Sequence, residues 1–213
     1  MIIERRYNGP PDSGNGGISC GLLAATTDYP VPEVMLRLPP PLDVELEVRD
    51  GQLLHGEDVI ATVAPGEVTL QPPAAVAHEV ARSAPSVLGS HAHPFPTCFG
   101  CGPLRDDGLG LLPNRVGDNL VAAVWTPGEI DEVLVWAALD CPGGWSHDIP
   151  GRPMVLGKMA AVIDRLPTVG KEHLVQGWSE GTEGRKVHTG SAIYDADGTV
   201  LAVAQATWIT LKQ

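Results

Sequence analysis

The stretch that decides the fold runs from Thr126 to Asp140 and reads TPGEIDEVLVWAALD. Its first four residues are typical of a helix start. Four later residues fall at i, i+3, i+4 and i+7, on one face of such a helix: Val133, Trp136, Ala137 and Asp140. Because Pro142 disfavours continuation, we expect the helix to end near Asp140. The sequence therefore predicts a mainly apolar helix face that also carries a carboxylate.

Strands are predicted on both sides of this helix. They are expected at residues 108–112 and 119–125 before it, and at residues 153–163, 172–180, 186–194 and 200–211 after it. The turn Asp195-Ala-Asp-Gly198 joins the last two strands, and Asp-Gly is a strong hairpin signal. Because parallel sheets need a crossover at every step, hairpins beside a single helix indicate an α+β fold.

The N-terminal part follows a similar plan. A helix of small residues is expected at 16–27, with strands at 33–38, 42–49, 52–55 and 58–63 and a hairpin turn at Asp50-Gly51. We divide the chain into an N-terminal unit (1–75), a connector (76–97) and a C-terminal unit (98–213). The connector lies in a proline-rich region and is expected to hold one short helical turn near residues 76–81.

Composition excludes several classes of protein. Hydrophobic residues make up 43% and charged residues 19%, and 14 Lys and Arg against 26 Asp and Glu give a formal charge of −12. With no basic run, nucleic acid is not expected as a partner. No long apolar run or signal-peptide pattern is present, so we expect no membrane association and a cytoplasmic location. Four cysteines are too few for a disulfide scaffold and suit a reducing compartment.

Several segments, taken in order, resemble the hotdog-fold acyl-CoA thioesterase superfamily. Residues 98–111 (CFGCGPLRDDGLGL) resemble the opening of such a unit, residues 136–140 (WAALD) the acid-bearing part of its helix, and residues 191–202 its closing hairpin. In the N-terminal unit, Asn15-Gly16-Gly17 is similar to the His-Gly-Gly helix start of the same superfamily. The chain thus resembles two hotdog units fused in one chain.

The resemblance implies a double hotdog, in which two curved antiparallel sheets each wrap around a central helix. It also implies hydrolysis of an acyl-CoA or related thioester, with coenzyme A as part of the substrate and no separate cofactor. A homodimer of double-hotdog chains is compatible with it. The alternative function is a non-catalytic module that binds an acyl ligand or builds an oligomer.

The same resemblance implies a division of catalytic roles. In hotdog thioesterases, a glycine amide at one helix start faces a carboxylate on the partner helix. Here Gly16 and Gly17 lie in the first unit and Asp140 in the second, and each unit lacks the other part. Nine positions after Asn15 stands Ala24, and Glu132-Val133 replaces the Gly-Gly pair in the second unit. The fused chain is therefore expected to hold one complete site.

The chemistry suits these residues. A helix N-terminal amide can stabilise the oxyanion of thioester hydrolysis, and Gly16 or Gly17 fits because a Cβ would obstruct the approach. Asp140 is the candidate base or nucleophile, and its apolar surroundings should raise its pKa. The glycines could instead simply lead into the helix, and Asp140 could be a structural, hydrogen-bonded carboxylate.

Four further residues are candidates for substrate binding: Asn15, Trp136, Arg185 and Lys186. Asn15 could hold the thioester, although capping the helix is the favoured role. Arg185 and Lys186 could receive the phosphates of coenzyme A or could be solvated strand ends. Trp145 and His147 are candidates for the lining of an acyl channel.

Histidines and cysteines are concentrated between His91 and Cys101. A tetrahedral zinc site could be formed by His91, His93, Cys98 and Cys101. However, all four of these ligands lie within eleven residues of the sequence. We therefore expect ordinary loop packing here and no metal. Cys141 has no evident histidine partner and is expected to pack in the core or at the helix end.

Overall fold

The computed structural model describes residues 1–212. The helical elements are η1 (Arg5–Tyr7), α1 (Gly16–Ala24), α2 (His78–Ser83) and α3 (Glu132–Trp145). The strands are β1 (Pro32–Leu36), β2 (Glu47–Arg49), β3 (Gln52–His55), β4 (Asp58–Pro65), β5 (Asn114–Gly117), β6 (Leu120–Trp125), β7 (Met154–Ile163), β8 (His173–Glu183), β9 (Lys186–Tyr194) and β10 (Val200–Thr210). The expected α+β composition is confirmed.

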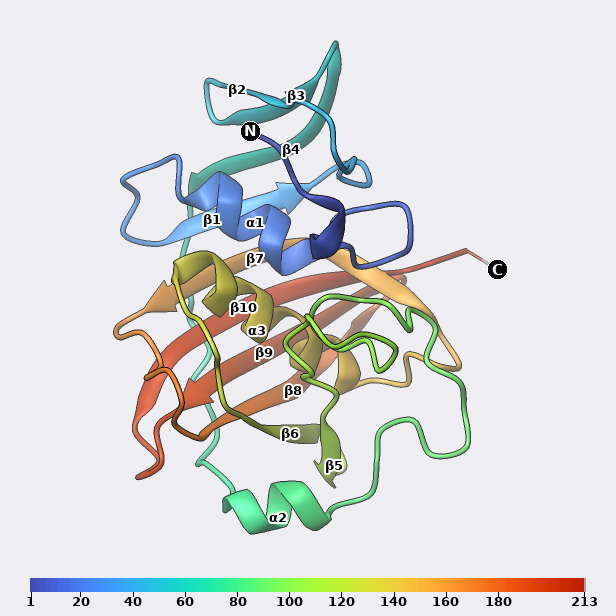
Figure 1. Ribbon diagram of the computed structural model, residues 1–213, viewed down its shortest axis with the longest axis vertical. Coiled ribbons are helices and arrows are strands. Elements are labelled where there is room, and N and C mark those ends of the chain that lie inside the picture. Colours follow the sequence, from blue (N-terminus) through green and yellow to red (C-terminus); the bar gives the residue numbers. More distant parts are fainter. Residues whose placement is uncertain (213) are drawn as a thin grey trace.

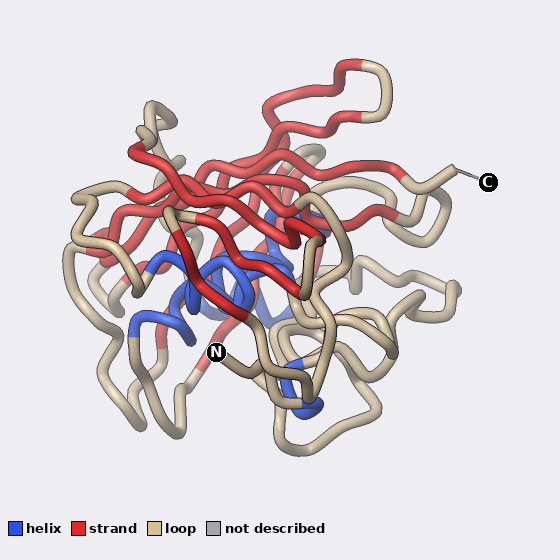
Figure 2. Tube along the Cα trace, turned by 90° about the horizontal axis from the view of Figure 1, so that it is seen from above, coloured by secondary structure: helices blue, strands red, loops and turns tan. Residues whose placement is uncertain are grey.

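All ten strands form one antiparallel sheet, in the order β2-β3-β4-β1-β7-β10-β9-β8-β6-β5 (Figure 1). Viewed from above, the sheet forms a curved layer (Figure 2), and helices α1 and α3 pack against one face of it. The main core lies between this sheet and helices α1 and α3, and includes the buried Ile18, Leu23, Val135 and Leu139. The two central helices are thus held side by side on one face of the sheet.

The two halves of the sheet repeat one strand order. In each half, the strand that follows the central helix, β1 or β7, lies at the middle of the sheet. Outward from it come the fourth, third and second strands after the helix: β4-β3-β2 on one side and β10-β9-β8 on the other. The middle strands pair directly, with Val34 opposite Met159. The strand order on one side of the β1–β7 pair is therefore matched on the other side.

Helix α3 begins and ends later than expected. Its N-cap is Asp131, whose side chain accepts a hydrogen bond from the Leu134 amide at 2.8 Å. The prediction of an end near Asp140 was wrong, because the helix continues through Pro142 to Trp145. Near the proline, the Ser191 hydroxyl of β9 donates to the Leu139 carbonyl at 2.6 Å, which ties this part of the helix to the sheet.

One predicted strand is absent from its expected place. Residues 108–112 form no strand, and pairing begins instead at β5. Gly110 has a φ of +66°, which interrupts an extended backbone. The other strands of the C-terminal part lie where the hydrophobic pattern placed them, within a few residues.

The connector crosses the outer face of the sheet. It contains α2, close to the predicted helical turn, and Ala81 of α2 packs in a second cluster with Leu174, Trp178 and Tyr194. The Tyr194 hydroxyl donates to the Pro73 carbonyl at 2.7 Å, which helps to fix the connector to β9. Among residues 1–212, no helix is both long and apolar enough to span a bilayer.

Candidate active site

The N-terminus of α1 is built by Asn15. Its side-chain oxygen accepts a hydrogen bond from the Ile18 amide at 2.9 Å, which is a helix N-cap. Its amide nitrogen points the other way and donates to Asp140 Oδ2 at 3.0 Å. Asn15 therefore performs two roles, since it caps one helix and binds a carboxylate on the other. Neither oxygen of an aspartate could perform the second role without a proton.

Glycines allow α1 and α3 to pack closely. A Cβ added at Gly17 would lie 2.5 Å from the Trp136 carbonyl oxygen and 2.7 Å from Asp140 Cβ. A Cβ at Gly21, one turn later, would lie 3.0 Å from Trp136 Cβ and from Val133 Cα. The start of α1 thus meets the later part of α3, and the helices run antiparallel. Gly17 has a packing role in addition to any catalytic one.

Asp140 is the point where the two helices meet. Its Oδ2 accepts hydrogen bonds from the Gly17 amide at 2.9 Å and from Asn15. Its Oδ1 is buried and has no hydrogen-bond partner in the part of the chain that the structure describes. The side chain as a whole is buried. One carboxylate oxygen is therefore held by two donors, and the other has no hydrogen-bond partner among the described residues.

The environment changes the acidity of Asp140. Burial raises its pKa from 3.8 to about 7, because the charged form loses its hydration. The hydrogen bond from the Gly17 amide opposes this rise, the charge of Cys98 adds to it, and the Asn15 amide lowers the pKa again. The group thus titrates near neutral pH, where a general base is most effective.

A cavity of about 570 Å³ opens at this meeting point. Its polar wall includes Asn15, Gly16 and Asp140. Apolar side chains form much of the rest: Leu36, Leu38, Phe95, Trp145, Met154, Leu156 and Trp208. Its size and character suit a small, largely apolar ligand whose polar group contacts the α1 start. Arg37, an exposed lining residue, supplies positive charge at the edge of this cavity.

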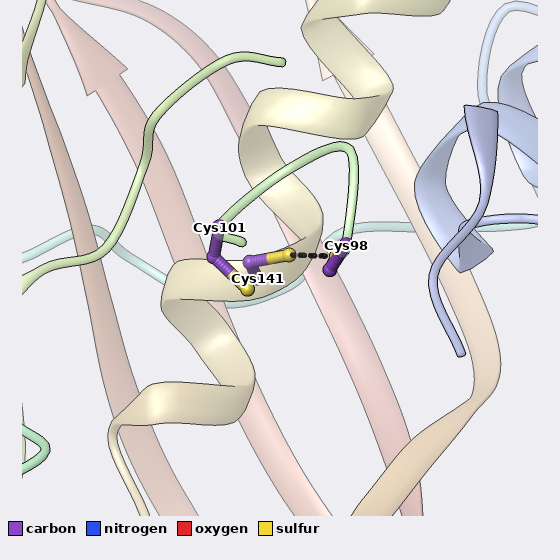
Figure 3. Close-up of side chains that lie close together, drawn as sticks. All are labelled: Cys98, Cys101 and Cys141. Carbon is purple, nitrogen blue, oxygen red and sulfur yellow. Dashed lines mark hydrogen bonds between the residues drawn. The ribbon is translucent and has the colours of Figure 1, made fainter. Parts of the chain in front are cut away.

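Three buried cysteines form another part of the cavity wall. Cys98 and Cys101 lie on the loop before β5, and Cys141 follows Asp140 on α3 (Figure 3). The Sγ atoms of Cys98 and Cys141 are 3.8 Å apart. Hydrogen bonds from the Cys101 and Cys141 thiols hold the pKa of Cys98 well below its usual range. Hydrogen bonds with Cys101 and Cys98, together with burial, raise the pKa of Cys141.

The structure brings together the residues Asn15, Gly16, Gly17 and Asp140, as the sequence predicted. It does not bring Trp136, Arg185 or Lys186 to the lining of the cavity. Trp136 packs against α1, and among the described residues neither Arg185 nor Lys186 lines the cavity, although Arg185 contacts the Thr210 carbonyl at 3.4 Å, beside two lining residues.

Of the two residues predicted to line an acyl channel, Trp145 and His147, only one lies at the cavity. Trp145 lines the cavity, whereas His147 contacts the Ser179 hydroxyl instead. Sequence reasoning missed Arg37 and the approach of Cys141 to the Cys98–Cys101 loop. For the approach of Cys141 to this loop, the only signal in the sequence was the Cys-x-x-Cys spacing of Cys98 and Cys101.

Comparisons with known proteins identify the fold. No family model and no curated protein matches the chain. A candidate thioesterase from Novosphingobium aromaticivorans is similar with a TM-score of 0.69 at 11% identity, covering 100% of this chain and 94% of the other. A protein of unknown function with a hotdog fold from Alicyclobacillus acidocaldarius gives 0.62 at 11% identity, covering 99% and 92%.

The tesB protein of Mycobacterium avium subsp. paratuberculosis gives a TM-score of 0.59 at 10% identity, covering 95% of this chain and 89% of the other. At such low identity, these likenesses show the fold alone. The chain has a hotdog fold, and this part of the sequence prediction is confirmed.

Proposed function

We propose that the chain is a fused double hotdog that hydrolyses a small acyl thioester, such as an acyl-CoA, in the cavity beside Asp140. The repeated strand order on either side of β1 and β7 supports the double hotdog. The thioesterase descriptions of fold neighbours agree with the proposed reaction class. The observation that carries the proposal is the carboxylate of Asp140, with one oxygen fixed by Gly17 and Asn15 and the other unpartnered at the cavity.

In the proposed reaction, Asp140 Oδ1 takes a proton from water. The water oxygen adds to the thioester carbonyl carbon, and negative charge develops on the carbonyl oxygen. The C–S bond then breaks, and the proton held by Asp140 passes to the leaving sulfur, so that a carboxylic acid and a thiol are the products. Direct attack by Asp140 through a mixed anhydride is the alternative route. Both routes need the free carboxylate oxygen.

The proposed oxyanion donor is the Gly16 amide. The Gly17 amide already donates to Asp140, so it is not free for the substrate. Gly16 lies at the cavity, and its amide has no protein acceptor among residues 1–212. A free amide in the first turn of a helix favours negative charge, which is what the tetrahedral intermediate develops. This assigns different roles to two adjacent glycines.

We further propose that Arg37, together with Arg185 and Lys186, receives the phosphates of the carrier. Arg37 is exposed at the edge of the cavity, and Arg185 lies next to the strand end that lines it. Trp136 is not part of this proposal, because it packs between the two helices.

A second candidate function is binding of an acyl ligand without turnover. It is favoured by one observation: the Gly17 amide and the Asn15 amide both satisfy Asp140, as in a structural carboxylate. The two functions differ in whether bound thioester is cleaved.

The test is a panel of acyl-CoAs of increasing chain length, assayed by release of free thiol. We expect the wild-type chain to cleave at least one of them and the Asp140→Asn variant to lose that activity. Asparagine keeps the shape and can still accept from Gly17, so the variant should fold. Unaltered hydrolysis in Asp140→Asn would refute the proposed role of this carboxylate. Binding of a non-hydrolysable acyl-CoA analogue with no turnover would favour the binding module.

A further inference from the structure

The strongest unexplained feature is the cluster formed by Cys98, Cys101 and Cys141. Their three Sγ atoms all lie within 4.8 Å of one another, and all three residues are buried (Figure 3). They come from two separate elements, a loop and the helix α3. The hydrolytic reaction proposed above uses none of them. The fourth cysteine, Cys20, is buried on α1 outside this cluster.

The loop that carries two of these thiols is shaped around them. In the segment Cys98-Phe-Gly-Cys-Gly102, the Gly102 amide donates to the Cys98 carbonyl at 2.8 Å, which closes a tight turn. A Cβ at Gly102 would lie 2.4 Å from the Cys98 nitrogen, and a Cβ at Gly100 would lie 2.5 Å from Cys141 Sγ. One glycine therefore makes the turn, and the other admits the third thiol. Ordinary core packing would fill this space with a side chain.

The spacing of the sulfurs fits a metal ion. Zinc bound to thiolates at about 2.3 Å in a tetrahedron places neighbouring sulfurs about 3.8 Å apart. This is the distance observed between Cys98 and Cys141. A single disulfide would use only two of the three sulfurs and leave one thiol unpaired. Three thiolates from a Cys-x-x-Cys turn and a helix are instead a common kind of zinc ligand set.

We propose that Cys98, Cys101 and Cys141 bind one divalent metal ion of the zinc class, with the fourth coordination position open to the cavity. All three residues line that cavity. Binding forms three sulfur–metal bonds and releases the protons of the bound thiols to solvent, with no change of oxidation state. A site with three protein ligands and one open position can accept water or a ligand group from the cavity.

His93 is not assigned as the fourth ligand. Its Nδ1 accepts a hydrogen bond from the Phe95 amide at 3.0 Å, so in the neutral ring Nε2 carries the proton and cannot ligate. Its ring packs edge-on against Trp145 instead, with centroids 4.9 Å apart. His91, the other histidine of the sequence motif, is exposed and lies outside the cluster. The third ligand is therefore Cys141, distant in sequence.

The test uses the purified full chain, reduced and freed of metal, and titrated with Co²⁺. We expect one equivalent to bind and to give thiolate-to-cobalt charge-transfer bands together with the visible bands of a tetrahedral site. Zn²⁺ should then displace the cobalt. Replacing any one of the three cysteines by Ala should weaken cobalt binding by more than about tenfold. Cys20→Ala is the matched control, since it removes a buried thiol outside the cluster, and it should bind cobalt like wild type.

A second measurement needs no variant. The chain, with and without Zn²⁺, is alkylated in mild denaturant, and the modified cysteines are mapped by mass spectrometry. Zinc should protect Cys98, Cys101 and Cys141 but leave the labelling of Cys20 unchanged. The proposal would be overturned by equal labelling with and without zinc. It would also be overturned if a variant with Cys98, Cys101 and Cys141 all replaced by Ala bound cobalt as well as wild type. The Asp140→Asn variant should still bind cobalt, so failure of the hydrolase and failure of the metal site are separate results.

Discussion

Helices α1 and α3 occupy equivalent places in the two halves, yet the two ends of their contact carry different groups. Both begin with a side-chain cap, Asn15 on the Ile18 amide and Asp131 on the Leu134 amide. Counted from these caps, Gly17 corresponds to Val133, and Asp140 corresponds to Ala24. At one end of the helix pair, the Gly17 amide therefore donates to the Asp140 carboxylate. At the other end, Val133 lies in the part of the contact that corresponds to Gly17, and Ala24 stands where Asp140 would be. A shared fold fixes where a site can form, and a few side chains decide whether it does.

The largest expected effect separates the two equivalent helix positions. Asp140→Asn should lower any acyl-CoA hydrolysis by at least about 100-fold, the usual range for loss of a general base. Ala24→Ser, at the corresponding position of α1, should leave the rate within about twofold. Release of free thiol measures both rates, and circular dichroism confirms folding. Equal losses in the two variants would mean that the helices are not functionally distinct.

The next effect tests the close helix contact. Gly17→Ala places a Cβ against the Trp136 carbonyl and Asp140, and should lower the free energy of unfolding by about 3 kcal/mol through overpacking. Gly128→Ala is the control, because a Cβ there meets nothing within 4 Å, and it should change stability by less than about 0.5 kcal/mol. Urea unfolding measures both. Similar values for the two variants would contradict the packing role of Gly17.

A smaller effect comes from making the two caps alike. Asn15→Asp keeps an oxygen for the Ile18 amide but removes the donor to Asp140, and should cost about 2 kcal/mol of stability. Asp131→Asn, the reverse exchange on α3, should cost less than about 0.5 kcal/mol, since both residues are good caps. The difference between the two unfolding curves measures the donor role of Asn15. If Asn15→Asp left the free energy of unfolding unchanged, the donor role of Asn15 would be refuted.

The last effect, smaller than the preceding ones over any single pH unit, is a dependence of stability on pH. The pKa of Asp140 is raised to about 7 in the folded chain, above its unfolded value of 3.8, so the folded state holds a proton that the unfolded state has lost. This contribution is complete below about pH 4 and is lost as pH rises to about 7, with a slope of at most about 1.4 kcal/mol per pH unit. Urea unfolding of metal-free protein should show it, and Asp140→Asn should remove it. An unchanged slope in the variant would assign the dependence to other groups.

Much of the fold could be predicted because regular elements carry local signals. The alternation of apolar residues placed β6 and β7 to β10, and the helical spacing placed α3. The end of α3 was misjudged, because the Ser191 donor that supports the helix near Pro142 is distant in sequence. The expected strand at 108–112 failed for a local reason, the left-handed backbone at Gly110.

The site was predicted where it depends on helix periodicity and missed where it depends on loops. Gly17 and Asp140 meet as expected, since each has a fixed position on a helix, whereas the hydrogen bond from Asn15 to Asp140 was not expected. The approach of Cys141 to Cys98 depends on an irregular loop, whose course no periodic pattern reveals. Arg37 follows the end of β1, and its place at the cavity depends on lining segments that are distant in sequence.

The covalent link between the two halves has a further consequence. Where a cleft is shared by two separate identical subunits, every substitution appears twice, and dilution can take the cleft apart. In this chain Gly17 and Asp140 each occur once, on different helices. A substitution on one helix therefore does not change the equivalent position on the other helix. The alanine at position 24 therefore leaves Asp140 unaffected, and the contact between Gly17 and Asp140 does not depend on protein concentration.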